Sequence, residues 1–449
     1  MAQLCIVLAS IMTLLWAVPA PAAEALPQPG KPAAAQSWTL AQVLAQAQAN
    51  NPDAEAARQR IAQAQAALQE ANASLYPHLA INGGYTRTNS PMQSFGNILN
   101  QGQFSDSIDF NKPGTTDALF AQIMLRYQLY NGGRDQAARL AASSQAEASL
   151  AQARVTQEQL SFEVIRAFHT ILQSEATGSA RLATVKSLQT ALDQANARFQ
   201  EGALLKEEVL MLEVEQASAE EALLQARHSE RLARRGLALL LGEMPRDVQL
   251  AGGGQAVLAV PADTAAVERP EMAAMAKMVA AQEAVLRQAR AGRYPSADAF
   301  ATYQVEQGTT MDEGSGDFWA AGLRLSQTLF DGKATRAAIS REEARLAELR
   351  AQARKLELNL AMEAEQARLN LNQETEKLAV STRRMQSAQE SARLTRLRFQ
   401  EGLCTSSELI DAEKRLAEAE AAHALASHGR QIAIAQLRRS YGLPQFANQ

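Results

Sequence analysis

The sequence predicts a mixed α+β membrane protein made of two tandem structural repeats, in which each chain supplies four strands and two long helical hairpins. Three observations lead to this prediction. The pentapeptide Arg198–Gly202 recurs letter for letter as Arg398–Gly402. Four segments of about ten residues alternate apolar and polar side chains, as half-buried strands do. The chain is rich in Ala, Gln, Glu, Leu and Arg and only 5% aromatic, which is typical of closely packed long helices.

The composition argues against several functional classes. The 449 residues carry a formal net charge of -4, which gives no electrostatic reason to expect a nucleic-acid partner. None of the five histidines pairs with another plausible ligand set at metal-ligand spacing. No Gly-rich phosphate loop precedes a Lys-Ser or Lys-Thr pair. We therefore expect no enzyme activity, no cofactor and no metal.

The N-terminal residues indicate export from the cytoplasm. The apolar run Ile6–Val18 is followed by small residues, which predicts a signal peptide over 1–23 and an N-terminal extension over 24–38. No Lys or Arg precedes the apolar run, so a single membrane anchor is the alternative. No second run of about 18 apolar residues occurs, and we expect no transmembrane helix in the mature chain.

Matching motifs at matching distances indicate a tandem duplication. Pro52 precedes Tyr76 by the same distance that separates Pro270 from Tyr294. The glycine-containing turns that precede the long helices also lie at equal distances from the two copies of the pentapeptide. The predicted division of the chain is repeat 1 over 39–242, a linker over 243–262, repeat 2 over 263–442 and a tail over 443–449.

The two repeats contain the same elements in the same order. Repeat 1 is predicted to contain a helix over 39–75, strands at about 79–88 and 118–130, a long helix over 132–199 and a return helix over 204–241. Repeat 2 is predicted to contain a helix, strands at about 297–306 and 318–330, a long helix over 332–399 and a return helix over 405–440. Pro52 breaks or kinks the first helix, and a polar loop over 89–117 separates the first two strands.

Each long helix needs a partner along its length. At 1.5 Å per residue such a helix spans about 100 Å, and it is not stable alone. Apolar residues of the return helices recur at alternating spacings of three and four, as in Val209, Leu212, Ala219 and Leu223 and again in Leu409, Ala412, Leu416 and Ala419. This pattern predicts a coiled-coil-like seam, so each pentapeptide lies at the turn of a helical hairpin.

The four amphipathic strands favour a barrel that several chains share. The long, thin, Ala-rich helices offer no core for the apolar face of a sheet, whereas a bilayer would accept it. An open sheet cannot sit in lipid, because the backbone groups at its edges would be unpaired. Four strands are too few to close a barrel, since about eight is the smallest number known. Two, three or four copies would satisfy this requirement, so we expect a homo-oligomer.

The chain resembles the TolC family of outer-membrane efflux and secretion channels over nearly all of its mature length. The resemblance rests on short motifs in a fixed order with duplicated spacing. They are Trp38-Thr39-Leu40, Asn51-Pro52-Asp53, Tyr76-Pro77, Leu129-Tyr130-Asn131-Gly132-Gly133-Arg134, Arg269-Pro270-Glu271, Tyr294-Pro295, Leu329-Phe330-Asp331-Gly332 and the two pentapeptides.

The resemblance implies a homotrimer whose 12-stranded outer-membrane β-barrel, four strands per chain, continues into a long periplasmic α-helical barrel. It implies an exit duct of a tripartite efflux pump or type I secretion system. Such a duct passively conducts solutes across the outer membrane from a periplasmic adaptor (membrane fusion) protein and an inner-membrane transporter. The barrel would lie in outer-membrane lipid, with a large periplasmic portion. Alternatives are a periplasmic coiled-coil adaptor and a non-conducting outer-membrane scaffold.

The resemblance also implies a periplasmic gate after the pentapeptides. Well-known relatives line a constriction with acidic residues six and nine positions after the second-repeat glycine, which here are Glu408 and Asp411. Glu208 is at the matching place in the first repeat. The alternative is that Glu408 completes a capping box with Thr405 and that Asp411 is only solvated. Some relatives have a gating arginine two positions after the second glycine, where this chain has Cys404.

The adaptor is expected to dock at the two hairpin tips. The residues of this expected site are Gly202, Gly402, Leu204, Leu403, Phe199 and Phe399. The two glycines are expected to adopt positive φ at helix C-termini. For the two phenylalanines, packing within the helical seam is favoured over contact with a partner.

Overall fold

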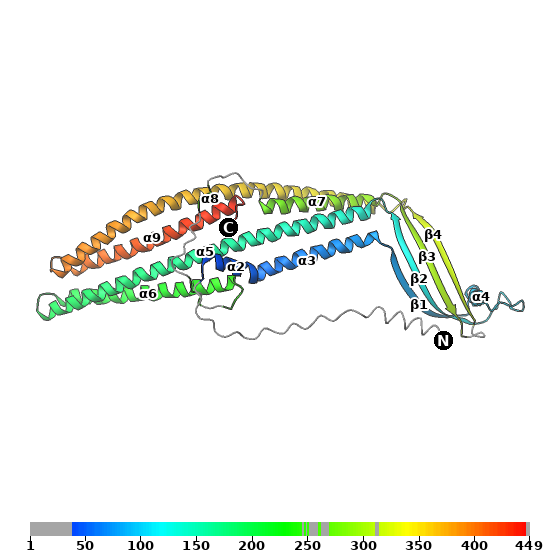
Figure 1. The fold of residues 1–449 in the computed structure, drawn as a ribbon, viewed down its shortest axis with the longest axis horizontal. Helices are drawn as coiled ribbons and strands as arrows, with labels where there is room; N and C mark the ends of the chain where they lie inside the picture. The colour runs from blue at the N-terminus through cyan, green and yellow to red at the C-terminus, as the bar shows by residue number, and fades with distance from the viewer. Residues whose placement is uncertain are drawn as a thin grey trace. The chain divides into compact units, whose positions relative to one another are not determined.

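The computed structural model describes residues 38–244, 247, 249–250, 259–261, 269–309 and 314–445. The expected signal peptide, the extension as far as residue 37 and most of the expected linker lie outside the described residues. Within the part that is described, long helices lead away from a single sheet, and both hairpin turns lie at the end far from that sheet (Figure 1).

The elements follow one another in the same order in both halves. The first half contains α2 (Leu40–Asn50), α3 (Pro52–Asn72), the 3-10 turn η1 (Ala73–Leu75), β1 (His78–Thr88), α4 (Pro91–Asn100), β2 (Thr116–Tyr130), α5 (Arg134–Gln200) and α6 (Lys206–Leu240). The second half contains α7 (Pro270–Ala291), β3 (Ser296–Gln307), β4 (Ser315–Ser326), α8 (Ala334–Gln400) and α9 (Ser406–Ser440). Among the described residues, no helix has the length and apolar character needed to cross a membrane.

The four strands form one antiparallel sheet in the order β1-β2-β3-β4. Side chains alternate between its faces, so one face carries apolar residues such as Ile81, Ile123 and Leu323, all of them exposed. On the other face, the Gln122 amide donates to Gln304 Oε1 at 3.0 Å. Within the described residues, neither β1 nor β4 has a strand on its outer edge.

The structure differs from the sequence-based expectation at two places in this region. The expected polar loop over 89–117 contains helix α4, which begins at Pro91, where the fixed φ of proline suits the first helical position. Strand β4 ends at Ser326 and not near residue 330. Ser326 pairs with Ser296, the first residue of β3, so any longer β4 would have no partner on β3.

The residues at the end of helix α4 are hydrogen-bonded to strands at the end of the sheet. The Gln101 amide donates to the Asp117 carbonyl at 2.8 Å and to Glu306 Oε1 at 3.2 Å. Glycines permit this close approach, because a Cβ on Gly316 would lie 1.8 Å from the Asn100 carbonyl oxygen. The segment therefore covers the end of the sheet on the side where the Glu306 carboxylate projects.

The long helices pair along their length. Helix α5 packs against α6, α8 packs against α9, and α5 against α9 joins the two hairpins. The helix order across the pairs is therefore α6, α5, α9, α8. Several contact positions are fully buried alanines, including Ala195, Ala392 and Ala419, which allow close approach of the helix backbones.

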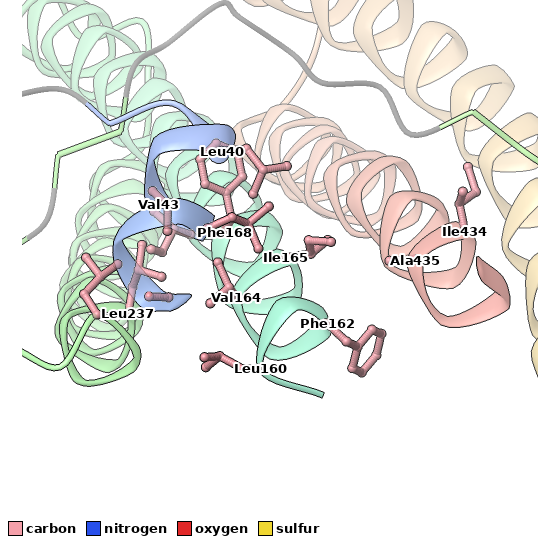
Figure 2. Packing of buried hydrophobic residues seen from close by; sticks show 14 of the residues in the cluster. Leu40, Val43, Leu160, Phe162, Val164, Ile165, Phe168, Leu237, Ile434 and Ala435 are labelled. Atoms are coloured by element: carbon pink, nitrogen blue, oxygen red, sulfur yellow. The ribbon is translucent and has the colours of Figure 1, made fainter. Parts of the chain in front are cut away.

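The largest apolar core surrounds the middle of α5. Leu40 and Val43 of α2 pack there with Phe168 of α5 and Leu237 of α6, and Ile434 of α9 closes the cluster (Figure 2). A capping box between Thr39 and Gln42 stabilises the start of helix α2. Burial of each such Leu, Val or Ile side chain stabilises the fold by about 1.5–3 kcal/mol.

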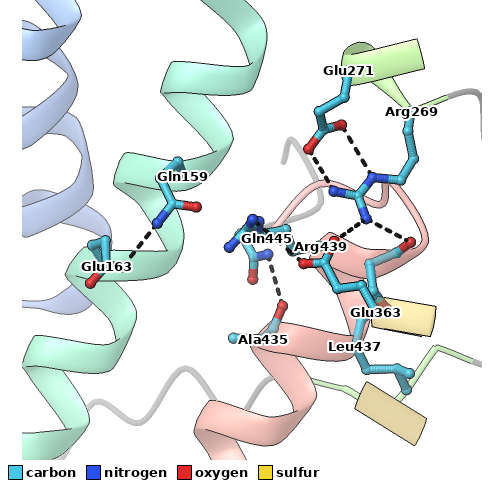
Figure 3. Close-up of polar contacts among 10 residues, drawn as sticks. Gln159, Glu163, Arg269, Glu271, Glu363, Ala435, Leu437, Arg439 and Gln445 are labelled. Carbon is cyan, nitrogen blue, oxygen red and sulfur yellow. Dashed lines mark hydrogen bonds and ion pairs between the residues drawn. The ribbon is translucent and has the colours of Figure 1, made fainter. Parts of the chain in front are cut away.

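A buried arginine fixes the start of the second repeat (Figure 3). Arg269 forms two hydrogen bonds with Glu271, and its Nη1 lies 2.8 Å from Glu363 Oε2 on α8 and 3.3 Å from the Ser440 carbonyl of α9. Burial alone would raise the pKa of Glu271, but the hydrogen bonds and charge of Arg269 outweigh it and lower that pKa. The cluster therefore joins α7 to both helices of the second hairpin.

The contact between α5 and α9 also contains two histidines that no sequence motif had paired. The Nδ1 atoms of His169 and His428 lie 3.4 Å apart. Burial and the neighbouring His428 lower the pKa of His169 to about 4, and burial lowers the pKa of His428. No cluster of three or more candidate metal ligands occurs among the described residues. The pair is therefore expected to be neutral and hydrogen-bonded at neutral pH.

This pair predicts that acid destabilises the protein between pH 6.5 and 4. The unfolded chain binds a proton at His169 near its ordinary pKa, whereas the folded chain resists it until about pH 4. The contribution of neutral His169 to the free energy of unfolding is therefore fully present above the unfolded pKa. It is lost as pH falls toward the folded pKa, by about 3 kcal/mol per chain. Thermal unfolding of detergent-purified protein across this range, followed by circular dichroism, measures the effect.

His169→Gln should flatten this dependence on pH. The matched control is His228→Gln, which changes an exposed histidine of α6 and should keep the wild-type slope. If the stability of the His169 variant fell with pH as steeply as that of the wild type, His169 would not be the cause of the acid destabilisation.

Candidate functional site

The two hairpin turns share one backbone geometry. Gly202 and Gly402 adopt φ values of 72° and 76°, which confirms the expected left-handed position at each helix C-terminus. The Ala203 amide donates to the Arg198 carbonyl at 2.8 Å, and the Leu403 amide does the same to Arg398. These bonds satisfy carbonyl groups that the ends of α5 and α8 would otherwise leave unpaired.

The arginines of the two identical pentapeptides have different partners. Arg398 stays within its own hairpin, where it donates to the Leu403 carbonyl at 3.1 Å and lies 3.5 Å from Glu408. Arg198 reaches the other hairpin, donates to the Gln400 carbonyl and lies 5.6 Å from the centre of the Phe399 ring. Arg198 therefore contacts the other hairpin, whereas the side chain of Arg398 contacts only its own.

The two phenylalanines also differ. Phe399 is 2% exposed and packs in an apolar cluster with Leu188 and Leu409, whereas Phe199 is 41% exposed and lies outside that cluster. The expected seam packing is therefore correct for Phe399 and wrong for Phe199. Of the two leucines at the expected docking site, Leu204 packs against the cluster. Leu403 is exposed.

Glu208 joins the two hairpins. Its Oε2 accepts hydrogen bonds from the Ser406 backbone amide at 3.3 Å and from the Ser406 hydroxyl at 2.9 Å. Ser406 is the first residue of α9, so the carboxylate of Glu208 lies at a helix N-terminus, where unpaired amide groups favour negative charge. The sequence offered no signal for this contact, because its two partners are far apart in the chain.

Glu408 and Asp411 do not contact Glu208 within one chain. Glu408 pairs with Arg398, and Asp411 lies 3.8 Å from Arg415 on the same helix. The Glu408 amide donates to Thr405 Oγ1 at 3.3 Å, which is one half of the alternative capping box. Both carboxylates are more than half exposed and remain accessible to solutes at the tip.

A groove of about 660 Å³ runs between the two hairpins near their tips. Met211 of α6 and Asp411 of α9, which occupy matching places in the two repeats, both line it. The Lys414 ammonium pairs with Glu215 at 2.7 Å and joins the two helices along the groove. Apolar side chains of α6, including Leu210, form part of its exposed wall.

An ion pair above the tips, in which only the carboxylate is buried, was not predicted from the sequence. The Glu413 carboxylate, 1% exposed, receives two hydrogen bonds from Arg396 of α8, at 2.5 and 2.8 Å, and one from Ser187 of α5 at 2.7 Å. The bond to Glu413 raises the pKa of Arg396. A charged residue next to the apolar seam position Ala412 is the only sequence signal.

Cys404 occupies the position where some relatives have arginine. It packs beside the Phe399 cluster, and burial raises the pKa of its thiol. The side chain is therefore neutral at physiological pH and supplies no charge to a gate. The charged links at this tip come instead from Arg198 and Glu208.

Comparisons with known proteins agree with this geometry. The family model described as Outer membrane efflux protein matches residues 43–243 and 262–443. The Fusaric acid resistance protein FusA of Burkholderia cepacia is 28% identical over 312 residues, which are 66% of this chain and 56% of that protein. The chain therefore spans little more than half the length of this relative.

Solved structures share the fold at low sequence identity. The outer membrane protein VceC of Vibrio cholerae superposes with a TM-score of 0.75 and 19% identity, covering 90% of this chain and 96% of VceC. The CmeC outer membrane channel of Campylobacter jejuni gives a TM-score of 0.78 and 15% identity over 90% of this chain and 85% of CmeC. With both repeats matched by the family model and the whole architecture shared with these structures, the chain belongs to the outer membrane efflux protein family.

Proposed function

We propose that the chain is the outer-membrane exit duct of a tripartite efflux pump or type I secretion system. Membership of the family places it in the outer membrane. The observation that carries the proposal is an open sheet with an exposed apolar face, joined to helices of 67 residues. Such helices extend about 100 Å from the membrane and would continue the path of a solute into the periplasm.

The apolar face of the sheet has the features of a lipid-facing surface. Trp319 is 75% exposed, and the neighbouring Leu323 and Leu325 are exposed to the same degree. On this face, Tyr85 lies near the end of β1 that is far from the helices, and Tyr127 lies near the end of β2 that adjoins them. Aromatic residues at both ends of an apolar band are typical of outer-membrane barrels.

Closure of the barrel requires further copies of the chain. The outer edges of β1 and β4 would leave backbone groups unpaired in lipid. Exposed apolar side chains also follow the two outermost helices of the hairpin layer, including Val214 and Leu224 of α6 and Leu358 and Met362 of α8. We propose that β1 and α6 of one chain meet β4 and α8 of the next, in a ring of three chains.

The test of this function is pore formation. Full-length protein purified in detergent should be a trimer by native mass spectrometry and should form ion-conducting pores in planar lipid bilayers. The physical reason is that only a closed barrel pairs the edges of the sheet while its polar face encloses water. A monomer that forms no pores would favour the non-conducting scaffold or the adaptor, and would contradict the exit duct.

We propose that the hairpin tips form the periplasmic gate. Glu208 with Ser406 and Arg198 with the Gln400 carbonyl connect the first hairpin to the second, and so does Lys414 with Glu215. These links hold the two tips together. Glu408 and Asp411 are exposed and share a helix face, so they supply negative charge at the entrance without closing it themselves.

Two variants separate these roles. Glu208→Ala removes a link between hairpins, so single-channel conductance should rise while block by hexamminecobalt stays near the wild-type level. Glu408→Gln combined with Asp411→Asn removes charge but no link between hairpins, so the block should weaken by roughly tenfold. Planar-bilayer recordings at fixed salt measure both quantities.

Asp193→Ala is the matched control for the link. The Asp193 carboxylate accepts a hydrogen bond from Gln189 of its own helix at 2.9 Å, so its loss removes an acidic residue near the tip without touching α9. Conductance of this variant should equal that of the wild type. Equal conductance of the wild type and Glu208→Ala would remove Glu208 from the gate, and unchanged block would remove Glu408 and Asp411.

We propose that a periplasmic adaptor docks at the same tips. Phe199 and Leu403 are exposed there, and a groove between α6 and α9 lies near the same tips. Gly202 has open space where a side chain would be, so a partner can approach its backbone. Buried Phe399, and Leu204 packed beneath it, support the turns, while Gly402 keeps the second turn in its left-handed conformation.

Site-specific crosslinking locates the docking surface. In a Cys404→Ser background, Phe199→Cys and Leu403→Cys should each be captured in cells by a membrane fusion protein, identified by mass spectrometry. Leu323→Cys, on the apolar face of the sheet, is the control and should not be captured by that protein. Capture at Leu323→Cys alone would place docking at the barrel and contradict the proposal.

A further inference from the structure

Four side chains meet on the polar face of the sheet, near the end that adjoins the helices. Arg126 of β2 is in register with Phe300 of β3, and Asp298 of β3 is in register with Arg324 of β4. Cross-strand partners project to the same side, and residues two apart along a strand share a face. All four side chains therefore lie on one face, opposite to that of Leu323.

The positive charges of this group are exposed and the negative charge is buried. Arg126 Nη2 lies 3.2 Å from Asp298 Oδ1, and the exposed fractions of these two side chains are 56% and 7%. Arg324 is exposed, and no carboxylate of the described residues lies within ion-pair distance of it. One ion pair and one additional guanidinium leave one net positive charge per chain at this level.

Arg324 is held in place by an aromatic ring and a glycine. Its guanidinium carbon lies 5.5 Å from the centre of the Phe300 ring. The ring lies over Gly322, since a Cβ there would be 3.0 Å from Phe300 Cζ. A cation over an aromatic face is attracted electrostatically by the ring. The charge is therefore positioned on the sheet while its donors remain free toward solvent.

The other carboxylate on this face is too distant to cancel the charge. Glu306 lies eight residues along β3 from Asp298, or about 26 Å at the usual rise of a strand. Charges more than about 10 Å apart across water are largely screened at physiological salt. Glu306 is also 5% exposed and is covered by the amides of Asn100 and Gln101.

We propose that Arg324, together with Arg126, forms a positive ring inside the barrel that favours anionic over cationic solutes. The inference rests on the proposed function, because it needs the polar face to line a lumen shared by several chains. Three copies would place three net positive charges at one level, and low-dielectric walls focus their field on the lumen. Small solutes that carry a carboxylate or phosphate are the class that guanidinium groups attract and bind.

The test is the reversal potential of wild-type and variant pores in planar bilayers under a potassium chloride gradient. Arg324→Gln should lower the ratio of chloride to potassium permeability by roughly twofold or more, and Arg324→Glu should lower it further. Arg324→Lys keeps the charge and should keep the wild-type ratio. Arg324 has no carboxylate partner among the described residues, so its substitution leaves no unpaired buried charge.

Arg87→Gln is the matched control. Arg87 is an exposed arginine of β1 on the same face as Tyr85, which is the proposed lipid side of the sheet. Its loss should leave the permeability ratio unchanged. An unchanged ratio in conducting Arg324→Gln pores, or an equal shift in Arg87→Gln pores, would overturn the inference. Wild-type protein that forms no pores would instead overturn the proposed function, and the inference with it.

Discussion

The unpaired backbone groups along the outer edges of β1 and β4 are the constraint on which the rest of the structure depends. A sheet with an apolar face is stable in lipid only when every amide and carbonyl has a partner. One chain supplies four strands whose backbone groups pair with those of neighbouring strands, but the outer edges of β1 and β4 stay unpaired within the described residues. A single chain therefore pairs the inner strands of its sheet but leaves the outer edges of β1 and β4 without partners in the membrane. The exposed apolar side chains of α6 and α8 likewise have no partner within the described part of one chain.

Much of this fold could be predicted from the sequence because its signals are local. Period-two alternation marks the strands, and the absence of proline marks the helices of 67 residues. The features that were missed depend on contacts between distant segments. Strand β4 ends at Ser326 because β3 offers no residue beyond Ser296 with which to pair. Helix α4 lies on the end of the sheet because Gln101 fits against glycines of the β3–β4 hairpin.

At the candidate site, too, features with a local sequence signal were predicted and features that depend on distant contacts were missed. Positive φ at Gly202 and Gly402 follows from local turn chemistry and was predictable. Identical neighbours of these glycines nevertheless behave differently, since Phe399 is buried between hairpins whereas Phe199 is exposed. A local pattern cannot separate two copies of one pentapeptide, because packing against the other hairpin decides which copy is buried. The link from Glu208 to Ser406 joins residues 198 positions apart and has no local signal.

The different partners of Arg198 and Arg398 have a consequence for stoichiometry. Three chains in a ring would present six turns that share one pentapeptide but are of two alternating kinds, one whose arginine reaches the other hairpin and one that accepts its hydrogen bond. A binding protein with a single mode of contact would find three equivalent positions on such a ring. One that occupied all six would have to bind in two distinct ways. The direction of one arginine side chain thus makes the two copies of one motif unequal as binding surfaces.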